Sequence, residues 1–140
     1  MITSKEYKGK NVAVLGLGKS GIATIESLTK VGANVFAWDD NTEICSKLDK
    51  KNYKFSNLEE LDFNNITSLV LSPGIPLNFP KPHPVVERAK SAGCEVIGDF
   101  ELFFRSKISA NVIGITGTNG KSTTTALITH ILKDKSIKVE

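Results

Sequence analysis

Short apolar runs alternate with stretches of helical spacing along the first hundred residues of the chain. The runs are rich in Val, Ile and Leu, and they have the length of buried strands. They predict strands over residues 11–16, 34–38, 68–71 and 95–97, with a minor strand at 54–55. Strands that alternate with helices in this way form a parallel sheet with right-handed crossovers.

The segments between these runs carry apolar residues three or four positions apart, which is typical of helices with one buried face. In the clearest case Ile22, Ile25 and Leu28 recur at this spacing, and Gly32 supplies a stop. Asp99 is placed to cap another helix, because its carboxylate can accept free amide hydrogens of a first turn. Beyond the helix that ends near Gly32, the predicted helices cover 42–51, 56–61, 84–92, 100–105 and 121–133.

The last third of the chain opens a second series of elements. Residues 106–111 are polar and typical of a linker, and 111–115 predict a fresh strand that leads into a glycine loop, a helix and the start of a strand at 136–140. We therefore expect an α/β fold in two parts. Residues 1–105 form a Rossmann-like parallel sheet with flanking helices, and 106–140 form the truncated start of a P-loop ATPase-type α/β domain.

Composition narrows the class of protein. A chain of 140 residues with 40% hydrophobic and 24% charged residues is long enough for one sizeable core and has the balance of an ordered soluble protein. The net charge of +3 is spread over scattered lysines, so nucleic-acid binding is not expected. The sequence carries no signal-peptide pattern and no apolar run of membrane-spanning length, which favours the cytoplasm and no membrane association.

Metal chemistry through Cys and His is not indicated. Cys45 and Cys94 stand far apart, which is typical of reduced, half-buried thiols. His83 and His130 have no partners at metal-ligand spacing and are interpreted as solvated or packing residues.

A first glycine motif lies between a predicted strand and a predicted helix. Gly16, Gly18, Lys19, Ser20 and Gly21 belong to a G-x-G-x-x-G pattern, which in this context lets backbone amides approach a diphosphate at a helix N-terminus. The alternative is that the glycines only permit tight packing of the helix on the strand.

Acidic and turn residues follow two other strands. Asp39, eighteen residues after Gly21, stands where a carboxylate commonly binds a ribose hydroxyl, so NAD, FAD or a nucleotide sugar could be the ligand. Ser72, Pro73 and Gly74 follow a later strand at the edge where parallel sheets bind ligands, although a plain rigid turn explains them equally well.

A second glycine loop contains the G-K-S end of a phosphate loop, and Ile115 stands where the strict motif has its first glycine. Lys121 can reach the β and γ phosphates of a nucleoside triphosphate, and Ser122 can bind Mg²⁺. The predicted triphosphate site consists of Gly117, Thr118, Asn119, Gly120, Lys121, Ser122 and Thr123.

Taken in order, the segments GLGKSG, DD, SPGIP, GDFELF and GTNGKST resemble the Mur ligase family over essentially the whole chain. GTNGKS is common to that superfamily, whereas the other segments resemble the members that join D-glutamate to UDP-N-acetylmuramoyl-L-alanine. The resemblance implies that the first domain binds UDP instead of NAD, with Lys19 and Ser20 at the diphosphate. Asp39 and Asp40 would face uracil and ribose, and Ser72, Pro73 and Gly74 would line the pocket.

The resemblance also implies the reaction. ATP and Mg²⁺ would bind at the second glycine loop, with Lys121 as the catalytic residue at the phosphates and Ser122 on the metal. The muramoyl-alanine carboxylate would become an acyl phosphate, which the amine of D-glutamate attacks. One departure concerns the uracil, because Asp40 and Asn41 stand where family members often have Thr-Arg, and the stacking arginine is missing.

Family members continue into a large central domain and a C-terminal domain that holds D-glutamate. We therefore expect the chain to be part of a longer enzyme and to be inactive as a ligase alone, with an apolar helix face at Leu127, Ile128 and Ile131 partly uncovered. Three alternatives stay open: an NAD-binding oxidoreductase or regulatory domain, a sibling Mur ligase, and a non-catalytic UDP-sugar-binding remnant.

Overall fold

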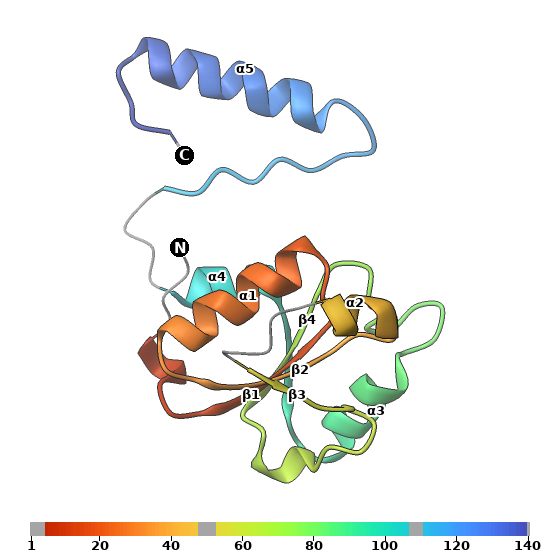
Figure 1. The fold of residues 1–140 in the computed structure, drawn as a ribbon. Coiled ribbons are helices and arrows are strands. Elements are labelled where there is room, and N and C mark those ends of the chain that lie inside the picture. The colour runs from red at the N-terminus through yellow and green to blue at the C-terminus, as the bar shows by residue number, and fades with distance from the viewer. Residues whose placement is uncertain (1–4, 48–52, 107–110, 140) are drawn as a thin grey trace. The chain divides into compact units, whose positions relative to one another are not determined.

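The computed structural model describes residues 5–47, 53–106 and 111–139. The chain divides into two compact units, Met1–Ile108 and Ser109–Glu140 (Figure 1).

The first unit is built on a five-stranded parallel sheet in the order β3-β2-β1-β4-β5. β1 lies at its centre, with Val14 opposite Ala37 on one side and Val70 on the other. This order confirms the predicted Rossmann-like sheet, and the strand positions agree with the sequence pattern to within one residue. The strands are β1 (Asn11–Leu15), β2 (Asn34–Trp38), β3 (Lys54–Phe55), β4 (Ser68–Leu71) and β5 (Glu95–Gly98).

Helices cover both faces of the sheet (Figure 1). They are α1 (Lys19–Lys30), α2 (Thr42–Lys47), α3 (Pro84–Ser91) and α4 (Asp99–Arg105), with 3₁₀ turns η1 (Lys5–Tyr7) and η3 (Phe63–Asn65).

The two-residue period of β1 divides its side chains between two hydrophobic clusters. Val12 and Val14 face the cluster of α1, α2 and α4, whereas Ala13 and Leu15 face that of α3. Because both faces are covered, β1 is apolar and buried from Val12 to Leu15, as expected of the central strand of a parallel sheet.

Two helix predictions need correction. Residues 56–61 hold a turn at 58–60 instead of a helix, because the Asn57 side chain accepts a hydrogen bond from the backbone N–H of Glu59 at 3.0 Å and so competes with helical pairing. The N-cap of α4 is Gly98, and the Asp99 carboxylate bonds to the N–H of Phe100 at 2.8 Å from inside the first turn. The helix predicted over 42–51 is described from Thr42 to Lys47, and the rest of the predicted range lies outside the described residues.

The second unit contains α5 (Lys121–Asp134), within one residue of its predicted end. The strands predicted at 111–115 and 136–140 are wrong for the described part of the unit, which has no strand. An apolar run becomes a strand only by pairing with another, and residues 111–139 offer no partner strand.

Candidate nucleotide site at the carboxyl edge of the sheet

The first glycine turn, residues 16–21, joins the end of β1 to the start of α1. Gly16 has a φ of +94°, which favours glycine, and a Cβ built on it would lie 2.8 Å from the Cβ of Ser72. Its N–H donates to the Trp38 carbonyl at 2.9 Å, which fixes the turn against the end of β2. Both backbone conformation and space therefore require glycine at this position.

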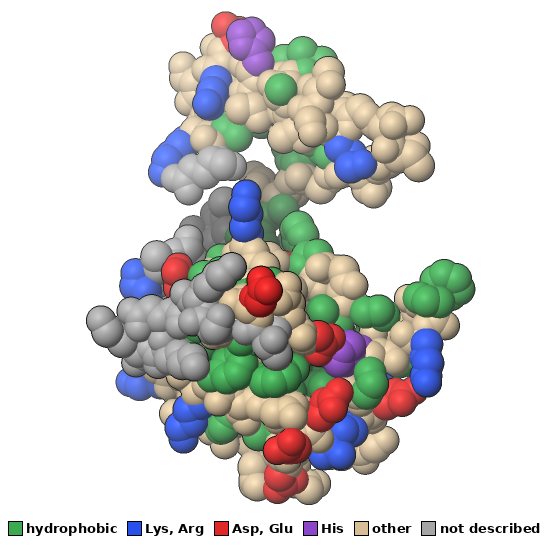
Figure 2. All heavy atoms as spheres, turned by 45° about the vertical axis from the view of Figure 1, so that its right-hand side comes forward, with side chains coloured by type: hydrophobic (Ala, Val, Ile, Leu, Met, Phe, Trp, Pro, Cys, Tyr) green, Lys and Arg blue, Asp and Glu red, His purple; other side chains and the backbone are tan. Residues whose placement is uncertain are grey.

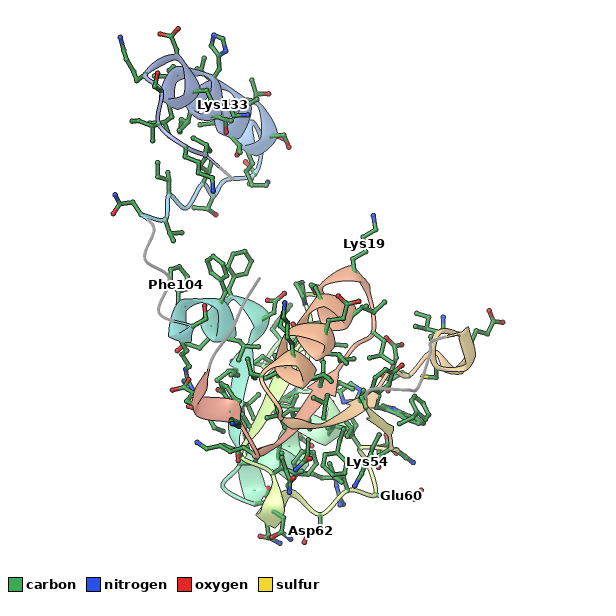
Figure 3. All side chains as sticks on the ribbon, turned by 60° about the vertical axis from the view of Figure 1, so that its left-hand side comes forward. Lys19, Lys54, Glu60, Asp62, Phe104 and Lys133 are labelled. Atoms are coloured by element: carbon green, nitrogen blue, oxygen red, sulfur yellow. The ribbon has the colours of Figure 1, made fainter. Side chains whose placement is uncertain are left out.

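The other two glycines of the turn have different roles. A Cβ on Gly21 would lie 1.9 Å from the Gly16 carbonyl oxygen, so this glycine permits the close packing of α1 on the turn. Gly18 is the N-cap of α1, has no side-chain cap and faces open space. No side chain caps the first amides of α1, and the first turn holds exposed Lys19 and half-buried Ser20. Figure 3 shows Lys19 projecting outward.

Ser72 ties the end of β4 to the glycine turn. Its hydroxyl donates to the Gly16 carbonyl at 2.7 Å, and its N–H donates to the Leu15 carbonyl at 2.9 Å. Ser72 is buried, whereas Pro73 and Gly74 are exposed. Because β1 and β4 are the neighbours at which the connections diverge to opposite sides of the sheet, this edge is where doubly wound folds bind ligands.

Asp39 connects the same turn to the end of β2. One carboxylate oxygen accepts the Leu17 N–H at 2.6 Å, and the other accepts the Asn41 N–H at 2.8 Å. Such bonds to an ionised acceptor are stronger than neutral ones. Each carboxylate oxygen has two lone pairs, so Asp39 can still accept a bond from a ligand hydroxyl while it holds the turn.

The structure adds His83 to the residues found from the sequence. His83 precedes α3 as its N-cap, and its Nε2 lies 2.8 Å from the Asp40 carboxylate. The sequence interpretation of His83 as a solvated or packing residue missed this pair. Its one local signal was a position just before Pro84, which begins the helix.

The resolved pKa shifts lie at the other end of β5. Arg105 donates to both carboxylate oxygens of Glu95, at 2.7 and 2.8 Å, and thereby lowers the pKa of that carboxyl. Burial raises the pKa of the Cys94 thiol to about 11, so this cysteine stays protonated at neutral pH. These residues stabilise the opposite edge of the sheet.

The second glycine loop, residues 117–122, has a local backbone suited to phosphates. Gly117 and Gly120 have φ of +147° and +77°, and Gly120 is the N-cap of α5 without a side-chain cap. The Lys121 ammonium donates to the Gly117 carbonyl at 2.6 Å, which holds it over the loop. All residues from Gly117 to Thr123 are exposed.

These residues fit a triphosphate better than a metal ion alone. Positive-φ glycines turn amides toward an anion, and the lysine adds a positive charge. Within the described ranges no cluster of three or more His, Cys, Asp and Glu residues could hold a metal ion. Ser122 can supply one oxygen ligand, and Mg²⁺ commonly takes its others from phosphates and water.

No described helix is long and apolar enough to span a membrane.

Comparison with known proteins supplies the family. Residues 10–98 match the model of the Mur ligase MurD-like N-terminal domain. The chain is 52% identical over 137 residues to UDP-N-acetylmuramoylalanine--D-glutamate ligase of Mesorhizobium japonicum, covering 95% of this chain and 29% of that protein. Proteins of the same name from Bartonella henselae and Wolbachia pipientis wMel are 44% and 47% identical, covering 100% and 96% of this chain and 32% and 26% of theirs.

A solved structure shows the likeness of fold. Shikimate dehydrogenase from Aquifex aeolicus aligns with a TM-score of 0.55 at 22% identity, covering 71% of this chain and 46% of that chain. The sheet order defines an α/β domain of the doubly wound class, and the glycine turn lies at the edge where that class commonly binds ligands. Within that class the chain belongs to the MurD-like Mur ligase family, and it spans about 29% of the length of its Mesorhizobium relative.

Proposed function

We propose that the chain provides the UDP-sugar-binding part and the ATP phosphate loop of a ligase that joins D-glutamate to UDP-N-acetylmuramoyl-L-alanine. The observation that carries the proposal is the first glycine turn, held by Ser72 and Asp39 at the carboxyl edge of the sheet. The relatives' name supplies the substrates. Residues 1–105 and 106–140 are the two proposed functional parts.

In the first part, the amides at the start of α1, which no side chain caps, bind the diphosphate, because a helix N-terminus carries partial positive charge. Lys19 and Ser20 add an ammonium group and a hydroxyl donor at the same end of the helix. Asp39 and Asp40 accept hydrogen bonds from the nucleoside. Ser72 acts by holding Gly16 in place, since its hydroxyl hydrogen is already donated to that residue.

In the second part, the loop 117–122 binds ATP. Lys121 neutralises charge on the transferring phosphate, and Ser122 contributes a ligand to Mg²⁺, which would supply further neutralisation. The terminal phosphate of ATP passes to the muramoyl-alanine carboxylate, and ADP leaves. The D-glutamate amine then attacks the acyl carbon, and phosphate leaves.

None of the described residues is assigned to D-glutamate. We therefore also propose that these 140 residues do not complete the ligation on their own. Because the reaction consumes ATP and a nucleotide-linked precursor, we place it in the cytoplasm.

A binding titration tests the proposal. Trp38, the one tryptophan, precedes Asp39 and packs on Phe55 with ring centroids 5.1 Å apart, so its fluorescence reports on the site. We expect saturable changes with UDP and UDP-N-acetylmuramoyl-L-alanine and none with NAD. Saturation by NAD alone would overturn the proposal in favour of a dehydrogenase-like domain.

A matched pair of variants locates the diphosphate. Lys19→Ala removes a charge at the start of α1, and Lys30→Ala removes one at its last turn. We expect about three-fold weaker UDP binding for Lys19→Ala, as for an exposed ion pair, and unchanged binding for Lys30→Ala. Equal effects of the two changes would indicate only a general effect of charge.

A further inference from the structure

His83 is held on both sides of its ring. Its Nδ1 accepts the Val85 N–H at 3.2 Å, and its Nε2 lies 2.8 Å from the Oδ2 of Asp40. Because Nδ1 acts as an acceptor, the ring hydrogen is on Nε2 and is donated to the carboxylate. The cap of α3 therefore fixes the tautomer that binds Asp40.

The pair connects two loops that leave the sheet at the candidate site. Asp40 is the second residue after β2, and His83 ends the segment that runs from β4 to α3. The backbone N–H of His83 also donates to the Pro76 carbonyl at 3.0 Å, which closes that segment on itself. Figure 2 shows several acidic side chains gathered on one face of the first unit.

Asp40 keeps one carboxylate oxygen for a ligand. The His83 side chain is 12% exposed and that of Asp40 is 58% exposed. In the described part of the chain, His83 is the one residue that bonds to the Asp40 carboxylate, through Oδ2. The Oδ1 atom is thus available next to Asp39, which holds the glycine turn.

We infer that His83 is a positioning residue for nucleotide recognition: it orients the Asp40 carboxylate so that Oδ1 accepts a hydrogen bond from an N–H or O–H group of the nucleoside. This inference rests on the proposed function. It assigns a role in specificity to a side chain that is too enclosed to stack on the base itself.

The test compares variants that separate the helix cap from the Asp40 bond. His83→Asn retains an oxygen that can cap α3 but does not reach Asp40. Asp40→Ala leaves the cap intact and removes the carboxylate. We expect each change to weaken UDP binding about five-fold, the upper range for a part-exposed pair, and we expect the double variant to bind no more weakly than either single variant.

Lys90→Ala is the matched control, because Lys90 of α3 donates to Asn78 of the same β4–α3 segment at 3.2 Å without touching Asp40. Its affinity for UDP should equal that of the wild-type chain. Nitrogen-15 NMR of the histidine ring should show hydrogen on Nε2 in the wild-type chain. In Asp40→Ala, the Nε2 resonance should shift while the Nδ1 resonance stays.

The outcomes separate the two proposals. If the wild-type chain does not bind UDP, the proposed function and this inference both fail. If it binds UDP but Asp40→Ala and His83→Asn bind equally well, the positioning role alone is refuted. An effect of Lys90→Ala as large as that of His83→Asn would also refute it, since general loosening of the segment would explain both.

Discussion

The two glycine loops of this chain share a local design but differ in their surroundings. The first has one positive-φ glycine and the second has two, and each leads into a helix whose N-cap is a glycine without a side-chain cap. The first turn is enclosed by the ends of three strands, through Trp38, Leu15 and Ser72, whereas every residue of 117–122 is exposed. Local sequence therefore sets the loop conformation, and the sheet sets how firmly it is held.

The helices that follow differ in the same way. α1 buries Gly21, Thr24, Ile25, Ser27 and Leu28. No residue of α5 is buried, and Leu127 and Ile131 are 58% and 50% exposed. A 14-residue helix without tertiary packing is only marginally stable in water, so the two units of the chain should differ widely in stability.

The largest expected effect is in amide hydrogen exchange. Amides of β1 and α1 should exchange about a thousand-fold or more slowly than those of α5, because the former open only on global unfolding. Exchange measured by NMR at several pH values would check this. Equal protection of α1 and α5 would mean that α5 is covered in solution, and a concentration series would then test self-association.

Next in size is the effect of adding one methyl group to each turn. Gly21→Ala places a carbon 1.9 Å from a backbone oxygen and should destabilise the first unit by about 3 kcal/mol or more. Gly120→Ala meets no atom within 4 Å but keeps a φ of +77°, a strain of about 1–2 kcal/mol that acts only on α5. Urea unfolding followed by Trp38 should reveal the first change and be unaffected by the second.

Hydroxyl-to-carbonyl bonds allow a finer comparison. Ser72 bonds to the Gly16 carbonyl in a buried site, and Thr125 bonds to the Lys121 carbonyl on an exposed helix. Ser72→Ala should lower the free energy of unfolding by about 1.5 kcal/mol, because it leaves a buried carbonyl unpaired. Thr125→Ala should slightly increase the helical circular dichroism of the second unit, since alanine has the higher helix propensity. A Ser72→Ala protein with the same free energy of unfolding as the wild-type chain would contradict the proposed role of this bond.

The contrast between the two units also explains what the sequence could predict. The five strands of the first unit were predicted to within one residue because each apolar run is short and bounded by turn residues. The helix predicted at 56–61 failed because Asn57 bonds locally to the backbone, and the strand at 111–115 failed for lack of a described partner.

The ligand-binding roles of the candidate residues remain predictions, but the structure shows how they are held. Bonds from Ser72 to Gly16 and from His83 to Asp40 join residues 56 and 43 positions apart. Such pairs depend on strand order and on the exact path of each loop, which no local pattern encodes. The motif indicated the kind of site, whereas the residues that support it required the three-dimensional structure.

The smallest expected effect concerns pH and the edge of the sheet opposite the site. The bonds from Arg105 hold the folded-state pKa of Glu95 below its ordinary value of 4.5, so the ion pair stabilises the first unit above that pH. The stabilisation is lost as the pH falls through the lowered folded-state pKa. Since the Glu95 side chain is 46% exposed, solvent screening limits the contribution to about 0.5 kcal/mol.

Glu95→Gln should therefore reduce the free energy of unfolding at pH 7 by that amount, and its difference from the wild-type chain should shrink as the pH is lowered well below 4.5. Glu59→Gln is the matched control, because Glu59 is exposed in a turn and is not among the acidic partners of Arg105, which are Glu95 and Glu101. Urea unfolding of all three proteins at pH 7 and at several acidic values measures the effect. A difference between Glu95→Gln and wild type that does not change with pH would show that the lost contact acts through packing, and the charge of Glu95 would then have no part in holding this edge.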